Sequence, residues 1–224
     1  MSGNADPSAA PGAGDGRGSR SGTERPDADG ERNEVAPLSP EELDFRLLTA
    51  VRDRAADPRV AAVARTLSHG GEHGALWLAA GAAAAAADSG HRAAWLRGTA
   101  LIAAAHLVSM GVKRVVRRPR PPLAGHRAPL VPTAGRHSFP SSHAASSVAA
   151  AVAFAALRPV TRRYVPVAAA AVCASRLLVG VHYPTDVAAG ALLGGLTAGA
   201  GRRWIAGSAG GAGPRTGPGS RRYG

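Results

Sequence analysis

The 224-residue sequence contains one lysine, Lys113, and one cysteine, Cys173. A single cysteine excludes a disulfide within the chain. Aromatic residues make up only 4% of a chain that is 45% hydrophobic, so its core must be built mainly from alanine, valine and leucine. Acidic residues are scarce in the later part of the chain, where Asp186 is the only one after Asp88. In so basic and apolar a segment, we expect this carboxylate to have a specific role.

The formal net charge is +12, and the cations are almost all arginine. Residues 1–40 hold seven acidic residues and four arginines, so the positive excess lies in residues 41–224. This balance favours an anionic partner, whether a nucleic acid, an anionic membrane surface or a phosphate-bearing substrate. Lys113 is the exception to the use of arginine, and it indicates a place that needs a compact ammonium group.

The two ends of the chain contain few large apolar residues. Residues 1–39 consist mostly of Gly, Ser, Pro, Asp, Glu and Arg, which predicts a disordered tail. They lack the basic start and apolar core of a secretory signal. Residues 207–224 return to Gly, Ser, Pro and Arg, which predicts a flexible basic tail. The predicted folded domain therefore comprises residues 40–206.

A helix start is predicted at residues 39–42, with Ser39 as N-cap and Glu42 completing a capping box. We expect Pro58 to divide the segment that follows into two helices. The many charges in this segment exclude a membrane span. Its amphipathic pattern is typical either of a helix lying in a bilayer interface or of one packed on a soluble core.

From residue 74 onward, alanine-rich apolar runs alternate with basic residues. Each run is shorter than the roughly 20 residues of a spanning helix, but aromatic residues and arginines lie near the run ends, as at membrane interfaces. Five helices with almost no acidic residues would make a poor soluble surface. We therefore predict an all-α, multi-pass bundle in the cell membrane in preference to a soluble helical bundle. The predicted apolar helices are 74–87, 98–112, 144–157, 164–175 and 187–201.

Three polar clusters lie at the ends of these runs. If the helices run up and down, all three clusters face the same side of the bundle. Lysine and arginine side chains in them can neutralise phosphate oxygens, and serines that precede a helix can bind an anion together with free backbone N–H groups. The clusters are residues 113–121, 139–143 and 175–186.

Two histidines of these clusters indicate group transfer to and from phosphorus. His182 and His143 supply one imidazole to attack phosphorus and one to protonate the leaving oxygen. Asp186 either holds the His182 ring through a ring N–H or caps the last apolar helix, and the spacing leaves both roles open. The sequence has no carboxylate-rich or Cys/His ligand set, so we expect no metal and no cofactor.

These residues resemble the three-part signature of the type 2 phosphatidic acid phosphatase and vanadium haloperoxidase superfamily. Lys113 to Arg120-Pro121 matches the first part, and Pro140-Ser141-Ser142-His143 matches the second, with Ser142 where glycine is usual. Ser175-Arg176 to His182 to Asp186 matches the third. The resemblance implies a helical fold with its site near a membrane face. It implies that His182 is the nucleophile that forms a phosphohistidine, that Asp186 orients it, and that His143 is the general acid and then the base. The phosphate cradle implied by the resemblance is Lys113, Arg120, Ser141, Ser142 and Arg176.

The leading hypothesis is an integral-membrane, metal-independent lipid phosphatase. Its substrate would be a phosphomonoester or pyrophosphate, such as phosphatidate or a polyprenyl phosphate or pyrophosphate. The alternatives are a vanadate-dependent haloperoxidase-like enzyme and a non-catalytic basic protein that binds membrane or nucleic acid. We expect Arg114, Arg117 and Arg118 to anchor the chain at the membrane interface. Because this patch lacks interleaved aromatic residues, the expected partners are a lipid phosphate and a membrane, with no nucleic acid.

Overall fold

A computed structural model describes residues 38–133 and 135–207, whose regular secondary structure is helical. This confirms the predicted all-α fold. Apart from Leu38, Ser39 and Gly207, the predicted tails lie outside the described residues.

The first two helices begin where the sequence predicts. Helix α1 (Pro40–Asp53) starts with the capping box, in which the Glu42 N–H donates to Ser39 Oγ at 3.2 Å and the Ser39 N–H donates to Glu42 Oε2 at 2.9 Å. Helix α2 (Pro58–Gly70) starts with its proline, directly after the N-cap residue Asp57. The proline therefore separates the two helices, as expected.

The later helices correspond to the five apolar runs, but two of them extend well beyond the predicted ends. The fourth helix takes in Arg97, whose guanidinium lies 5.6 Å from the centre of the Trp204 ring. That helix ends where Arg117 adopts a left-handed conformation, with φ of 54°. These helices are α3 (Ala75–Ala87), α4 (Arg92–Val116), α5 (Ser142–Leu157), α6 (Thr161–Leu178), α7 (Pro184–Ala200) and the short α8 (Arg202–Ala206).

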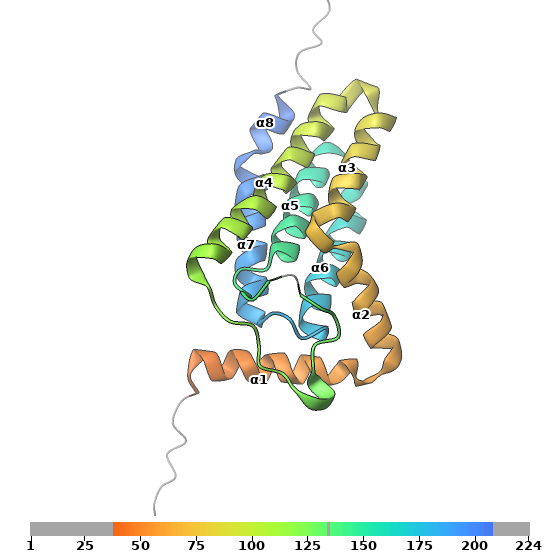
Figure 1. Ribbon diagram of the computed structural model, residues 1–224. Helices are drawn as coiled ribbons and strands as arrows, with labels where there is room; N and C mark the ends of the chain where they lie inside the picture. Colours follow the sequence, from red (N-terminus) through yellow and green to blue (C-terminus); the bar gives the residue numbers. More distant parts are fainter. Residues whose placement is uncertain (1–37, 134, 208–224) are drawn as a thin grey trace, which may run out of the picture. The chain divides into compact units, whose positions relative to one another are not determined.

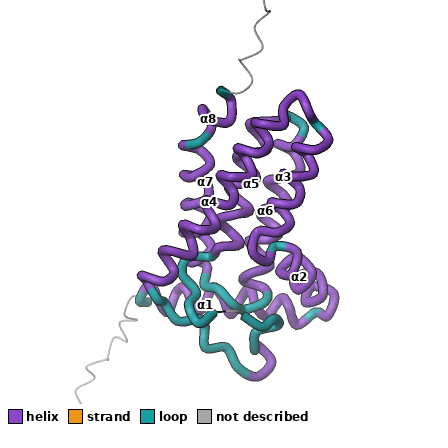
Figure 2. Tube along the Cα trace, turned by 45° about the horizontal axis from the view of Figure 1, so that its top comes forward, coloured by secondary structure: helices purple, strands orange, loops and turns teal. Residues whose placement is uncertain are grey.

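Helix α5 lies at the centre of the bundle and packs against α4, α6 and α7 (Figure 1). Helix α3 packs against α4, and α2 packs against α6. Helix α1 crosses one end of the bundle, where the long connection between α4 and α5 also lies (Figure 2). The central helix is lined with small side chains, which fits the low aromatic content. Its buried alanines are Ala144, Ala145, Ala149, Ala150 and Ala153.

Helix α7 approaches α5 closely because two of its glycines face that helix. A Cβ atom on Gly190 would lie 2.3 Å from the Ser141 carbonyl oxygen, and one on Gly194 would lie 2.1 Å from the Ala145 carbonyl oxygen. Neither position has room for a side chain. The Ser141 N–H also donates to the Asp186 carbonyl oxygen at 2.9 Å. The first turns of α5 and α7 are therefore held against each other.

One helical segment of the described residues, Ser89–Val116, is long and apolar enough to cross a membrane, and most of its apolar stretch faces outward. Helices α3 and α5 are apolar but shorter. Helix length and composition therefore support one span and do not confirm the predicted multi-pass arrangement.

Candidate active site

A cavity of about 270 Å³ opens among the ends of α4, α5 and α6 and the turn before α7. It brings together side chains from all three polar clusters, which lie up to 69 residues apart in the sequence. The predicted site residues that line it are Lys113, Arg120, Ser142, His143, Arg176 and His182.

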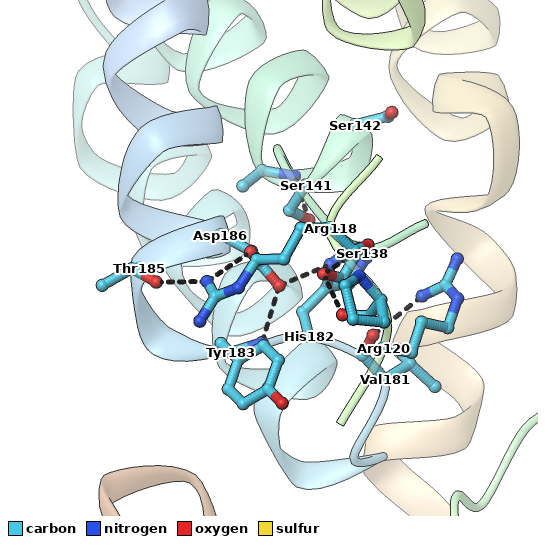
Figure 3. Close-up of polar contacts among 12 residues, drawn as sticks. Arg118, Arg120, Ser138, Ser141, Ser142, Val181, His182, Tyr183, Thr185 and Asp186 are labelled. Carbon is cyan, nitrogen blue, oxygen red and sulfur yellow. Dashed lines mark hydrogen bonds and ion pairs between the residues drawn. The ribbon is translucent and has the colours of Figure 1, made fainter. Parts of the chain in front are cut away.

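His182 lies in the turn between α6 and α7 and is 1% exposed. Its Nδ1 is 3.6 Å from Asp186 Oδ2, an ion-pair distance slightly too long for a hydrogen bond. The same carboxylate oxygen accepts the Tyr183 N–H at 2.9 Å (Figure 3). Asp186 therefore has the capping role, and its carboxylate faces the imidazole at an ion-pair distance, while its role in holding the ring through a ring N–H stays a prediction. With Nδ1 turned to Asp186, Nε2 is the ring nitrogen left for the cavity.

Burial lowers the pKa of His182 to about 4. Asp186 acts in the opposite direction, and the positive charges of Arg176, Lys113 and Arg120 lower the pKa further. The imidazole is therefore neutral at pH 7, with a lone pair available to attack an electrophile.

The two arginines of the cavity differ in how far their donors are satisfied. Arg120 Nε donates to the Gly135 carbonyl oxygen and Nη1 donates to the Val181 carbonyl oxygen, both at 2.7 Å. Arg176 is 5% exposed and donates through Nη1 to Ser68 Oγ, but its buried Nε has no hydrogen-bond partner among the described residues. A buried donor without a partner is costly unless a ligand supplies the acceptor. The Arg176 guanidinium is therefore suited to an anionic oxygen.

The second cluster places one serine and one histidine at the cavity. Ser142 is the first residue of α5, and its Oγ accepts a hydrogen bond from Ser109 Oγ at 2.9 Å. It has an ordinary helical backbone, so serine fits where the signature has glycine. The buried Nε2 of His143 has no hydrogen-bond partner among the described residues. This nitrogen is thus available to exchange a proton with a bound ligand.

Ser141 is placed differently from the other predicted cradle residues. It is the fully buried N-cap of α5, its Oγ accepts the Ala144 N–H at 3.4 Å, and it is not among the residues that line the cavity. Its part in phosphate binding remains a prediction.

Other cavity residues match no motif and were missed by the sequence reasoning. Helix α2 and the turn that follows it supply Ser68, His69 and Glu72, and α4 supplies His106 and Met110. No signal in the sequence places the first three here, because they lie more than 40 residues before Lys113. By contrast, no group of three or more His, Cys, Asp or Glu side chains in residues 38–133 and 135–207 is arranged to hold a metal ion.

We predicted that Arg118 anchors the chain at the membrane interface, but its guanidinium instead binds two carboxylates of the protein. Its Nη1 donates to Asp186 Oδ1 at 2.9 Å and its Nη2 donates to Asp44 Oδ2 at 2.8 Å. The guanidinium also lies 4.0 Å from the centre of the Tyr183 ring. Arg118 turns inward because two carboxylates lie within reach, and one of them comes from α1, 74 residues away. That contact cannot be predicted from the local charge pattern.

Comparisons with known proteins point to one family. The sequence profile of the PAP2 superfamily matches residues 93–208. The decaprenylphosphoryl-5-phosphoribose phosphatase of Mycolicibacterium smegmatis is 47% identical over 135 residues, which cover 59% of this chain and 72% of that protein. The protein of the same name from Mycobacterium tuberculosis is 40% identical over 151 residues, covering 66% of this chain and 82% of that one. A crystal structure of a transmembrane PAP2-type phosphatidylglycerolphosphate phosphatase from Bacillus subtilis shares the fold, with a TM-score of 0.63 and 23% identity over 77% of this chain and 87% of that chain.

Proposed function

The chain belongs to the PAP2 superfamily and is a phosphatase, and we propose that it is an integral-membrane enzyme that removes a terminal phosphate from a polyprenyl-linked substrate through a phosphohistidine. The observation that carries the proposal is that buried His182, the buried Nε2 of His143 and an unpaired Arg176 Nε lie at one cationic cavity. The haloperoxidase-like alternative has no comparable support, because the curated relatives found are named phosphatases.

The proposed reaction has two steps at phosphorus. First, His182 Nε2 attacks, the bond between phosphorus and the ester oxygen breaks, and His143, which enters this step protonated, gives its proton to the departing alkoxide. Next, His143 takes a proton from water, whose oxygen attacks phosphorus and breaks the P–N bond to release inorganic phosphate. Lys113, Arg120 and Arg176 stabilise the negative charge on the equatorial oxygens during both steps. Asp186 stabilises the positive charge that develops on the His182 ring.

The cavity itself favours a small, polar leaving group next to the phosphate. Its volume of about 270 Å³ is below the roughly 300–1,000 Å³ of pockets that enclose a drug-sized ligand, so a long prenyl chain must lie outside it. Ser68, Glu72 and Thr133 line the cavity and are suited to hydrogen bonds with sugar hydroxyls. This supports a phosphorylated sugar carried on a polyprenyl phosphate, the substrate class for which the two mycobacterial relatives are named.

A substrate panel tests the proposal directly. Purified protein in detergent and EDTA is expected to hydrolyse a polyprenylphosphoryl-5-phosphoribose with a kcat/KM about 10-fold or more above that for phosphatidate or a polyprenyl pyrophosphate. Orthovanadate, which mimics the pentacoordinate transition state, should inhibit all of these reactions. Phosphate release from each lipid is the measurement.

Three different results would each contradict one part of this expectation. Loss of activity in EDTA with recovery in magnesium would show a metal-dependent mechanism. Faster hydrolysis of phosphatidate would move the substrate class to glycerolipids. No phosphate release from any of the lipids would exclude the phosphatase function for the isolated chain.

The outer surface of the described residues supports insertion in a bilayer. Large apolar side chains face outward on several helices, and α1 exposes Leu43 and Leu47 while it buries Leu48 together with Asp44 and Arg52. A helix with this arrangement is suited to lie in the bilayer interface, which favours the first of the two interpretations of this segment. The exposed residues on the longer helices include Leu96, Leu107, Val108, Val167, Leu192 and Leu196.

We therefore expect the protein to remain in the membrane pellet after an alkaline carbonate wash and to dissolve only in detergent. If the protein were not inserted in a membrane, apolar surface of this extent would be exposed to water. Immunoblots of pellet and supernatant measure the distribution, with a peripheral membrane protein as the released control. Appearance in the carbonate supernatant would contradict membrane integration.

A further inference from the structure

Asp44 of α1 is a buried carboxylate that contacts the first turn of α7. It is 3% exposed, and its Oδ1 accepts the Thr185 N–H at 3.0 Å. Its Oδ2 accepts hydrogen bonds from Thr185 Oγ1 and from Arg118 Nη2. Free N–H groups at a helix start need acceptors, and here one acceptor comes from a different helix. Asp44 thus holds the element that carries Asp186.

Arg118 joins Asp44 to the catalytic pair. Its two terminal nitrogens bind different carboxylates, Nη2 that of Asp44 and Nη1 that of Asp186. Nη1 also donates to Thr185 Oγ1 at 2.7 Å (Figure 3). The planar fork of a guanidinium fixes the angle between two such partners, which a lysine cannot do. Asp186 in turn lies 3.6 Å from His182 Nδ1. The contacts therefore run from α1 to the attacking imidazole.

We propose that Asp44 is a positioning residue for catalysis, which acts through Arg118 to hold Asp186 in the orientation that sets the His182 ring. The proposal rests on the assigned nucleophilic role of His182. It adds to the site a helix that precedes the matched part of the family profile, residues 93–208. Asp44 does not line the cavity, so it acts on the rate of the chemical step and not on contacts with the substrate.

The charges explain why a carboxylate is needed at this position. Arg118 carries one positive charge between two negative ones, and Asp44 satisfies the part of the guanidinium that faces away from Asp186. Without that charge, Arg118 loses one of its two carboxylate partners, and the direction of the Asp186 carboxylate depends more heavily on its hydrogen bond from the Tyr183 N–H. Because ångström-scale displacement of a reacting group is costly, the effect should appear in kcat.

The test is a double-mutant cycle on the full-length protein in detergent, with phosphate release from the lipid substrate as the assay. Asp44→Asn keeps the shape and an acceptor for the Thr185 N–H, and it should lower kcat by about 10- to 100-fold with little change in KM. In an Arg118→Gln background, the same substitution should change kcat by no more than about twofold, because the residue through which it acts is absent.

Asp53→Asn is the matched control. Asp53 also lies on α1 and is ion-paired with Arg127 at 2.7 Å. It makes no contact with Arg118 or Asp186. The kcat of this variant should stay within about twofold of the wild-type value, because a substitution at an exposed position usually has a small effect. An unchanged kcat in Asp44→Asn, or an undiminished effect in the Arg118→Gln background, would overturn the proposal and leave Asp44 a structural role. An inactive wild-type protein would instead contradict the proposed function, so the two failures are distinguishable.

Discussion

The His182→Ala protein is expected to turn over no phosphate ester, whatever its leaving group. If His182 attacks phosphorus, no covalent intermediate can form without it. The loss in kcat should be about 10⁶-fold, the order found when the nucleophile of a covalent mechanism is removed. The neutral ring expected from its pKa of about 4 means that the wild-type nucleophile needs no prior deprotonation at pH 7.

Two assays measure this loss, phosphate release from the lipid and nitrophenolate release from p-nitrophenyl phosphate. His126→Ala is a suitable control, because His126 is exposed and does not line the cavity. It should retain wild-type activity in both assays. Hydrolysis of p-nitrophenyl phosphate by the His182→Ala protein at a rate near that of the wild type would contradict the assignment of the nucleophile.

Removal of His143 is expected to have an effect that depends on the leaving group. A lipid or sugar alkoxide needs a proton, so phosphorylation of the His143→Ala protein by the natural substrate should slow by about 10²–10⁴-fold, the usual range for general acid catalysis. A nitrophenolate leaves without help, so that step should be nearly spared. Hydrolysis of the phosphohistidine still requires a base, and the enzyme should stall once it is phosphorylated.

Given p-nitrophenyl phosphate, the His143→Ala protein should therefore release a burst of one nitrophenolate per active site and then stop. Rapid-mixing absorbance measures the burst, and the stalled protein should carry acid-labile, base-stable phosphate on His182. Wild-type protein under the same conditions should continue to turn over. A burst from His182→Ala instead, or phosphate mapped to Ser141 or Ser142, would reverse the roles assigned to these residues.

The sequence predicted the parts of the molecule that depend on local chemistry. The capping box at Ser39 and Glu42 and the break at Pro58 follow from which backbone groups a side chain can satisfy. The gathering of the three clusters at one cavity follows from the alternation of helix directions. The predicted ends of α4 were wrong by several residues because the prediction followed the apolar run 98–112, whereas arginine and lysine also favour a helix and α4 continues through them at both ends.

The remaining parts of the site depend on which helices meet in space. Asp44 has the spacing of an ordinary exposed helix residue, and only the crossing of α1 over the end of the bundle brings it to Arg118. Ser68 and Glu72 reach the cavity for a similar reason, because α2 packs along α6. Such contacts leave no periodic pattern in a single sequence.

The glycine contacts between α7 and α5 limit which substitutions related chains can accept at this helix pair. Gly190 and Gly194 lie against the backbone at the start of α5, so a larger side chain at either position would displace α7 from the helix that bears His143. The walls that face a leaving group come from other elements, among them Ser68, Glu72 and Thr133. Substitutions in those walls are therefore expected to alter the preferred lipid with less effect on the packing of α5 against α7.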